Sequence, residues 1–340
     1  MILLIQTAAA CAGLFHEEGV LAESDAQTVL LEQLDGQVRS TWLVRYSGDA
    51  EAFGWVIPVF GDLETVEDAD SGLFEELSAK TAPSVIYETA YEDDNTCGCG
   101  GMAKSGDFDG RNGADSGANT LDVEVLGEGF TGAYTWTNVA ADSIDPLLGW
   151  LDLNGWDAEM QRPALEAYVA EGGVSFVAIS LSGGAEGTAD LPPLQLTVSG
   201  DALRYPSTMA RYGAVQKVKT TLYVLGDQGA SVSGWASEQR SEINASSDDD
   251  SATVWEEALW ETGGDSSTAV LTWAGSHEDG WLTRFDLYAD KEVHTADMVF
   301  ALDEAELWAS TSIWHSEWVE SAAVWLLPLT LLGAGLRRRG

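Results

Sequence analysis

The chain has 340 residues, 45% of them apolar and 21% charged, which is enough apolar material for one or two domains with hydrophobic cores. It carries 56 Asp and Glu against 16 Lys and Arg, a formal net charge of −40. This excess of acid argues against nucleic acid as a partner, because binding DNA or RNA relies on basic side chains that neutralise phosphates. Salt adaptation, divalent cation binding or a solubilised extracellular surface would each account for it.

Residues 1–10, MILLIQTAAA, are typical of the end of an export signal, in which a short apolar run precedes small residues. The basic residues that usually come first are missing, so either the true start lies upstream of Met1 or the signal is weak. We expect cleavage near Cys11, with lipidation of Cys11 as the alternative.

Residues 321–340 predict a membrane anchor or sorting tail. The run Ala322–Leu336 is uncharged and is followed by three arginines. As a helix it would rise about 22 Å, less than the ~30 Å hydrocarbon core, and the arginines fit the positive-inside bias. The alternative is a buried core helix. The segment resembles the C-terminal sorting tails of myxobacterial surface proteins, which implies an exported protein held at the cell envelope or surface.

The first half of the chain reads as strands with one short helix. Residues 28–34 and 41–46 predict a hairpin across Asp35-Gly36, a strong turn dipeptide. The apolar run 53–60 is expected to pair with 41–46 across a polar turn and to form the centre of a sheet. A helix over 72–80 and a strand over 84–91 follow.

The next part alternates helices and strands. Asp145-Pro146 and Pro163 are typical helix starts, and the almost wholly apolar run 174–181 predicts a central strand. The further elements expected are a strand over 121–126, a helix that starts at Asp145-Pro146 and ends at 153, a second helix over 164–171, and strands over 194–198 and 220–225. The fold class is therefore α+β. We expect two mixed units, 11–120 and 121–226, with largely antiparallel sheets and short helices.

Residues 227–320 predict an acidic, tryptophan-rich extension. Ser246–Ser251 is acidic and indicates a linker or loop. Large apolar side chains suit the core of a late sheet segment, so core packing is favoured over a carbohydrate-binding face. The tryptophans concerned are Trp255, Trp260, Trp273, Trp281, Trp308, Trp314 and Trp318.

The three cysteines are candidates for one disulfide, because an exported chain favours oxidised cysteines. Cys97 and Cys99 stand too close in sequence to bridge each other easily, so Cys11 paired with one of them is expected. The alternative is a tetrahedral zinc site formed by these three thiolates and His16.

The loop 104–120 is a candidate calcium-binding loop. Oxygen-bearing side chains alternate there with glycines that would let the chain curl round an ion, namely Asp107, Asp109, Asn112 and Asp115. The loop lacks the regular spacing and the closing bidentate Glu of such sites, and a solvated insertion is the alternative. Beyond zinc or calcium, no cofactor is predicted.

No local motif for catalysis is present. Ser182 lacks the glycine two residues before it that a nucleophile elbow requires, and the histidines contain no His-Glu-x-x-His pattern. We therefore predict no catalytic residue and favour a structural or binding module over an enzyme. A metal-binding envelope protein and an unrecognised hydrolase remain the alternatives.

Seven short motifs, in this order, resemble the exported bacterial proteins of the domain-of-unknown-function family numbered 2330. They are Cys11–His16, Tyr46–Val59, Cys97–Cys99, Trp150–Trp156, Tyr168–Gly172, Pro192–Leu196 and Leu222–Gly226. The resemblance implies export and a mixed fold, and it carries no activity. His16 stands where the family pattern has a second cysteine, and imidazole can replace a thiolate as a metal ligand. The expected partners are a membrane, through the tail, and a cell-surface protein or glycan.

Overall fold

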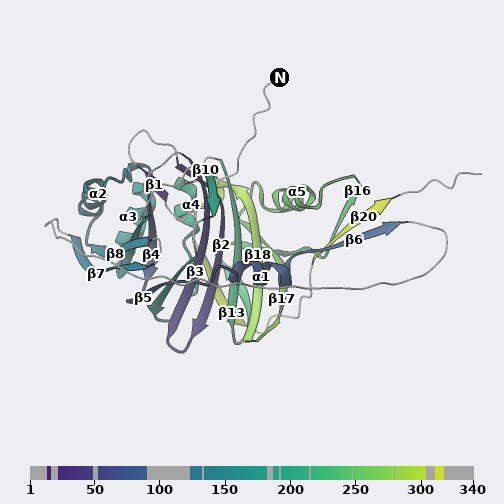
Figure 1. The fold of residues 1–340 in the computed structure, drawn as a ribbon, viewed down its shortest axis with the longest axis horizontal. Helices are drawn as coiled ribbons and strands as arrows, with labels where there is room; N and C mark the ends of the chain where they lie inside the picture. Colours follow the sequence, from purple (N-terminus) through teal and green to yellow (C-terminus); the bar gives the residue numbers. More distant parts are fainter. Residues whose placement is uncertain are drawn as a thin grey trace, which may run out of the picture.

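The computed structural model describes residues 14–16, 22–48, 53–89, 123–131, 134–181, 187–190, 193–213, 216–246, 248–278, 280–303 and 311–317. Sheet dominates these residues, and the helices are few and short (Figure 1). The α-helices are α1 (Leu73–Thr81), α2 (Ile144–Leu153), α3 (Arg162–Glu171), α4 (Ser207–Gly213) and α5 (Ser251–Gly263), and the 3-10 helices are η1 (Glu159–Gln161) and η2 (Lys291–Val293).

Sheet A has the strand order β1-β4-β9-β8-β7, and all of its neighbouring strands are antiparallel. The strand predicted over 174–181 lies between β4 and β8, which confirms its central position. The strands of sheet A are β1 (Leu14–His16), β4 (Phe53–Phe60), β7 (Val123–Thr131), β8 (Tyr134–Ala141) and β9 (Val174–Leu181).

Sheet B has the order β15-β17-β18-β13-β2-β3-β11-β5, with β10 also paired to β3. The β2–β3 hairpin across Asp35-Gly36 is confirmed, and Gly36 has the positive φ of 71° that favours glycine in such a turn. Its strands are β2 (Ala22–Leu34), β3 (Gln37–Gly48), β5 (Leu63–Asp68), β10 (Gly187–Asp190), β11 (Leu194–Ser199), β13 (Lys217–Gly226), β15 (Ala236–Gln239), β17 (Thr268–His277) and β18 (Gly280–Asp290).

The predicted pairing of 41–46 with 53–60 is wrong. Strand β3 already has β2 on one edge and β11 on the other, while β4 pairs with β1 and β9 in sheet A. The chain thus crosses from one sheet to the other between β3 and β4. Trp42 of β3 and Trp55 of β4 meet edge to face at 5.9 Å between ring centroids, and both are almost fully buried. The aromatic pair therefore joins two facing sheets instead of two strands of one hairpin.

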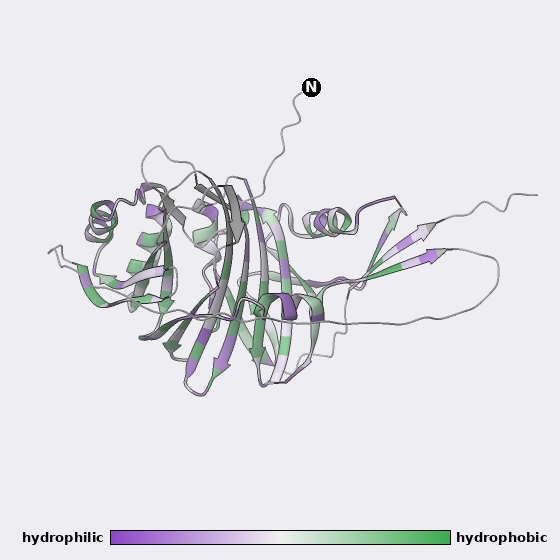
Figure 2. Cartoon of the chain, viewed as in Figure 1, coloured by the Kyte–Doolittle hydropathy of each residue, from purple (hydrophilic) through white to green (hydrophobic). Residues whose placement is uncertain are grey.

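Helices cover the outer faces of the two sheets (Figure 1). On sheet A, α2 and α3 pack their apolar side chains, among them Leu147, Leu151 and Leu165, against Val56 and Phe176. On sheet B, Phe74 and Leu77 of α1 pack against Leu30, Tyr223 and Leu282. Hydrophobic and hydrophilic residues alternate along many of the strands (Figure 2), as expected when the two faces of a sheet meet different surroundings. The short helices predicted over 72–80, up to 153 and over 164–171 are confirmed as α1, α2 and α3.

Two small sheets complete the described part of the chain. Sheet C, made only of parallel pairs in the order β16-β20-β6, lies at the far side of sheet B from sheet A (Figure 1). Sheet D has the order β12-β19-β14 and is antiparallel. Their strands are β6 (Ser84–Thr89), β16 (Glu242–Ser246) and β20 (Ser312–Glu317), and β12 (Arg204–Tyr205), β14 (Gly229–Ser233) and β19 (Met298–Asp303).

The predicted α+β class agrees with this mostly antiparallel arrangement of sheets and short helices. Both main sheets combine strands from the ranges 11–120 and 121–226, and sheet B also takes β15, β17 and β18 from the range 227–320. Of the tryptophans in that range whose side chains are described, Trp235 is buried in the core between the sheets and the others are half-buried, and Trp273 packs beside the α1 cluster. Within the described ranges no helix is long and apolar enough to cross a membrane. The predicted anchor, 321–340, lies outside them.

Candidate functional site

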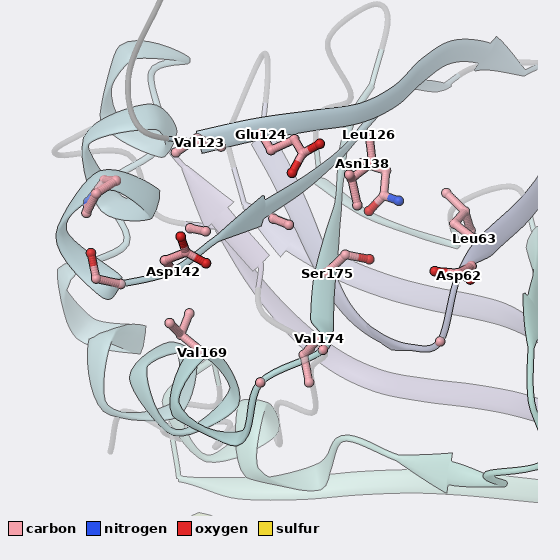
Figure 3. Close-up of a pocket in the computed structure, with 17 residues that line it drawn as sticks. Asp62, Leu63, Val123, Glu124, Leu126, Asn138, Asp142, Val169, Val174 and Ser175 are labelled. Atoms are coloured by element: carbon pink, nitrogen blue, oxygen red, sulfur yellow. The ribbon is translucent and has the colours of Figure 1, made fainter.

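A pocket of about 1120 Å³ lies at one end of sheet A (Figure 3). Its walls come from four places: the turn between β4 and β5, the beginning of β7, the end of β8 with the start of α2, and the turn between α3 and β9. The pocket therefore gathers residues that are more than a hundred positions apart in the sequence.

Close backbone packing positions the first wall. Gly61 has a φ of 143°, and a Cβ on it would lie 2.1 Å from the carbonyl oxygen of Ser199. The Asp62 amide donates to Ser199 Oγ at 2.9 Å, and the Ser199 amide donates to the Asp62 carbonyl at 2.9 Å. Only glycine fits at position 61, because any side chain would push β5 away from β11. The turn thereby holds Asp62 at the pocket.

Two glycines shape the opposite wall. Gly172 and Gly173 have φ values of 76° and 71°, so they end α3 and turn the chain directly into β9. Val174 and Ser175, the first two residues of β9, line the pocket as a result.

Asn138 and Ser175 form the buried floor of the pocket. Asn138 pairs with Val177 across β8 and β9, and Ser175 lies two residues from Val177, so both side chains lie on the face of sheet A that packs against sheet B. Figure 3 shows both projecting toward Asp62 and Leu63. They are only 4% and 5% exposed.

The side-chain oxygens of both floor residues lack hydrogen-bond partners. Asn138 Oδ1 and Ser175 Oγ have no hydrogen-bond partner among the described residues. A buried polar group left without a partner costs about 1–3 kcal/mol. The floor therefore holds two oxygens that a bound molecule can stabilise by donating a hydrogen bond to each.

The rim of the pocket is acidic. Asp62, Glu124 and Asp142 are exposed carboxylate residues of the lining, and no Lys, Arg or His is found among the described residues that line it. The rim therefore favours positive charge and hydrogen-bond donors. The carboxylates are spread along the pocket, and no group of three or more His, Cys, Asp or Glu close enough to hold a metal ion occurs in the part of the chain that the structure describes.

The family described as "Uncharacterized protein conserved in bacteria (DUF2330)" matches residues 5–301. The chain belongs to DUF2330. The match extends well past Gly226, where the resemblance in the seven motifs ends, and it includes the strands that complete sheet B. No curated protein matches the chain.

Among solved structures, the DUF2330 chain is similar to baculovirus P35, with 8% identity and a TM-score of 0.35, over 86% of this chain and 98% of that one. A mutated baculovirus P35 after caspase cleavage has a TM-score of 0.29 at 8% identity, over 81% and 93% of the two chains.

Most of the site residues predicted from sequence lie outside the described part of this DUF2330 protein. This applies to Cys11, Cys97 and Cys99 and to the calcium candidates Asp107, Asp109, Asn112 and Asp115. His16 is the last residue of β1, where it pairs with Phe53 of β4. The disulfide, zinc and calcium hypotheses therefore stay predictions.

The sequence offered no signal for the DUF2330 pocket. Asp62 follows a strand, Asn138 lies within one, and Ser175 is the second residue of another, each in a local sequence that indicates nothing beyond structure. In so acidic a chain, neighbouring carboxylates are the background expectation. Only the pairing of β8 with β9, and of β11 with β5, brings these residues to one place.

Proposed function

We propose that the chain is an extracytoplasmic binding module whose pocket accepts an organic cation with several N–H donors, such as a polyamine. The observation that carries the proposal is the unpaired Asn138 Oδ1 in the floor of a pocket whose charged lining residues are all carboxylates. Such a ligand would donate to the floor oxygens and place positive charge among Asp62, Glu124 and Asp142.

Charge favours a cation over a neutral hydroxyl-rich molecule. Each exposed ion pair contributes only about 0.2–1 kcal/mol, but a polyamine would form several at once and would also release the buried floor oxygens from their unpaired state. Salt screens exposed charges, so we expect the affinity to fall as the ionic strength rises. A neutral triol would gain the hydrogen bonds without the charge contribution.

Calorimetric titration with spermidine tests the proposal. We expect one molecule bound per chain, and weaker binding in Glu124→Gln and in Asp62→Asn, which keep the shape of the side chain and remove its charge. Glu166→Gln is the matched control, because Glu166 is exposed on α3, does not line the pocket and changes the net charge equally.

The comparison of these variants distinguishes binding at the pocket from a general attraction of cations to the acidic surface. With a formal charge of −40, the whole surface attracts cations weakly. Equal weakening in Glu166→Gln and Glu124→Gln, or a stoichiometry of many weak sites, would show that spermidine binds to overall charge and would overturn the proposal.

We also propose that the protein is exported and anchored to the membrane of the cell envelope. This location is supported by the export-like residues 1–10 and by the uncharged run with terminal arginines in 321–340. A chain ending at Glu320 should be released in soluble form from cells in which the full chain stays with the membrane fraction. Recovery of the full chain among soluble cytosolic proteins would contradict both export and anchoring.

A further inference from the structure

Far from the pocket, strand β16 of sheet C is followed by a turn and then by helix α5. Strand β16 ends at Ser246, and α5 begins at Ser251 after a short connection. Because β16, β20 and β6 are parallel, their carboxyl ends meet at the same edge of the sheet. In open α/β sheets, ligands bind outside the carboxyl ends of the parallel strands.

A buried histidine at this edge contacts a serine hydroxyl. His315 of β20 is 1% exposed, and its Nε2 lies 2.9 Å from Ser251 Oγ. Its Nδ1 lies 2.8 Å from the carbonyl oxygen of Ser246. These residues are far apart in sequence, and β16 and β20 bring them together because Ala245 pairs with His315.

The chemistry of these contacts fixes the proton positions. A carbonyl oxygen only accepts, so Nδ1 carries the ring proton and donates it to Ser246. In the neutral ring, Nε2 then has a free lone pair and accepts from the Ser251 hydroxyl. A serine hydroxyl, an imidazole that accepts its proton and a group that orients the imidazole are the three parts of an activated nucleophile.

Helix α5 begins at the serine, so its first backbone amides lie beside the hydroxyl, next to the carboxylates of Asp248, Asp249 and Asp250. Ser251 is its first residue, where backbone N–H groups point out of the helix toward its start. The Asp250 carboxylate is engaged in capping, since it accepts from Thr253 N at 3.0 Å and from Thr253 Oγ1 at 3.2 Å. Amide groups at a helix start are suited to stabilising an oxyanion that develops next to the serine.

Apolar side chains lie alongside on β6. The Tyr87 ring stacks on the His315 ring at 4.8 Å between centroids with an interplanar angle of 19°, and it is 70% exposed. Val85 lies on the same face of β6, two residues away, and is 42% exposed. This surface suits an apolar group next to the reacting bond.

We propose that Ser251 and His315 form a nucleophile and general-base pair that hydrolyses esters of apolar carboxylic acids. Ser251 Oγ attacks the ester carbonyl carbon while its proton passes to His315 Nε2. The tetrahedral intermediate collapses, the C–O bond to the alcohol breaks, and Nε2 returns the proton to the leaving oxygen. Water then attacks the acyl-serine by the same route, which releases the acid and restores the hydroxyl.

This site is independent of the pocket on sheet A, because sheet C and α5 lie on the other side of sheet B (Figure 1). Loss of spermidine binding would leave the ester proposal unaffected, and loss of ester hydrolysis would leave the pocket proposal unaffected.

Labelling with an alkyl fluorophosphonate tests the pair on the purified chain. The Ser251 oxygen would bond to phosphorus, fluoride would leave, and the hydroxyl proton would pass to His315. We expect one adduct, located on Ser251 by peptide mass spectrometry, and hydrolysis of p-nitrophenyl butyrate that the label abolishes. Ser251→Ala should abolish both, whereas Ser237→Ala, at an exposed serine of β15, should alter neither.

His315→Asn separates the base from the fold. Asn can still donate to the Ser246 carbonyl, but it has no group that takes the serine proton, so we expect the labelling rate to fall about 10²-fold or more. If that variant fails to fold, by its melting curve, the Ser251→Ala result alone decides. An unlabelled wild-type chain, an adduct on another residue, or hydrolysis that survives Ser251→Ala would overturn the proposal.

Discussion

Asp297 and Asn138 are both buried polar side chains, yet their surroundings differ completely. Asp297 accepts from Tyr168 Oη at 2.7 Å, from Arg204 Nε at 2.8 Å and from the Thr208 amide at 3.1 Å. Asn138 Oδ1 accepts from none of the described residues. The first side chain joins parts of the fold, and the second lies in the floor of a pocket. Full pairing is typical of a structural role, and the unpaired oxygen beside the cavity is the feature on which the proposed binding function rests.

The Asp297 cluster connects the layers of the molecule. Tyr168 belongs to α3 on sheet A, and Arg204 belongs to β12 of sheet D. Arg204 also donates to both oxygens of Glu171, at 2.7 and 3.0 Å, and its guanidinium lies 4.0 Å from the centre of the Phe60 ring. Burial and the neighbouring carboxylate of Asp297 raise the pKa of Tyr168, so its hydroxyl remains a donor. The cluster holds α3 against sheet D.

The largest effect is expected for Asp297→Ala. This change removes the acceptor for Arg204, Tyr168 and Thr208 at once and leaves a partly buried guanidinium without one of its two carboxylates. We expect a loss of about 3–5 kcal/mol in the free energy of unfolding, measured by denaturant titration. Glu166→Ala, at an exposed residue of α3, should change it by less than about 0.5 kcal/mol. A loss below about 1 kcal/mol for Asp297→Ala would mean that the cluster does not hold the layers together.

His294 is a third kind of buried polar residue. It is fully buried, its ring meets the Trp235 ring edge to face at 4.7 Å, and neither ring nitrogen has a hydrogen-bond partner among the described residues. Burial lowers its pKa to about 3, with Asp290 opposing and Arg211 adding to the shift. The ring is therefore neutral in the folded chain at any pH above that value.

The expected consequence is a loss of stability in acid. Between the unfolded pKa of 6.5 and the folded value of about 3, the unfolded chain binds the extra proton. As the pH falls through that window, this residue therefore lowers the free energy of unfolding by up to about 1.4 kcal/mol for each pH unit. Above pH 6.5 it has no such effect. His294→Phe keeps the ring contact and should remove this part of the slope. Identical slopes from pH 7 to 4 in the two chains would contradict the burial of a neutral ring.

The sequence predicted local structure well where one pattern determined it. The strands over 53–60 and 174–181 have the predicted bounds, because continuous apolar runs of that length suit strands buried on both faces. Pro163 and the glycines at 172 and 173 likewise mark the limits of α3. In each case the residues that decide the element lie within it.

Pairing and sites could not be predicted in the same way. Strand β4 has the right bounds and the wrong predicted partner, since the choice between β3 and β9 depends on edges that distant strands already occupy. Ser251 and His315 lie far apart in the sequence, and no local pattern links them. Only the parallel pairing of β16 with β20 makes them neighbours. The pocket depends on such long-range pairings for every one of its polar residues.

The smallest effect on the free energy of unfolding is expected for Asn138→Leu, which removes the unpaired side chain of the comparison. Leucine has nearly the same shape as asparagine and carries no polar atom, and it would face the apolar inter-sheet core beside Val177. Because the replaced oxygen has no partner to lose, we expect the free energy of unfolding to stay within about 1 kcal/mol of the parent chain or to rise. Spermidine binding should weaken at the same time, since the ligand loses its buried acceptor. A loss of stability close to that of Asp297→Ala would show that Asn138 is a structural residue, and the floor of the pocket would then not be a binding surface.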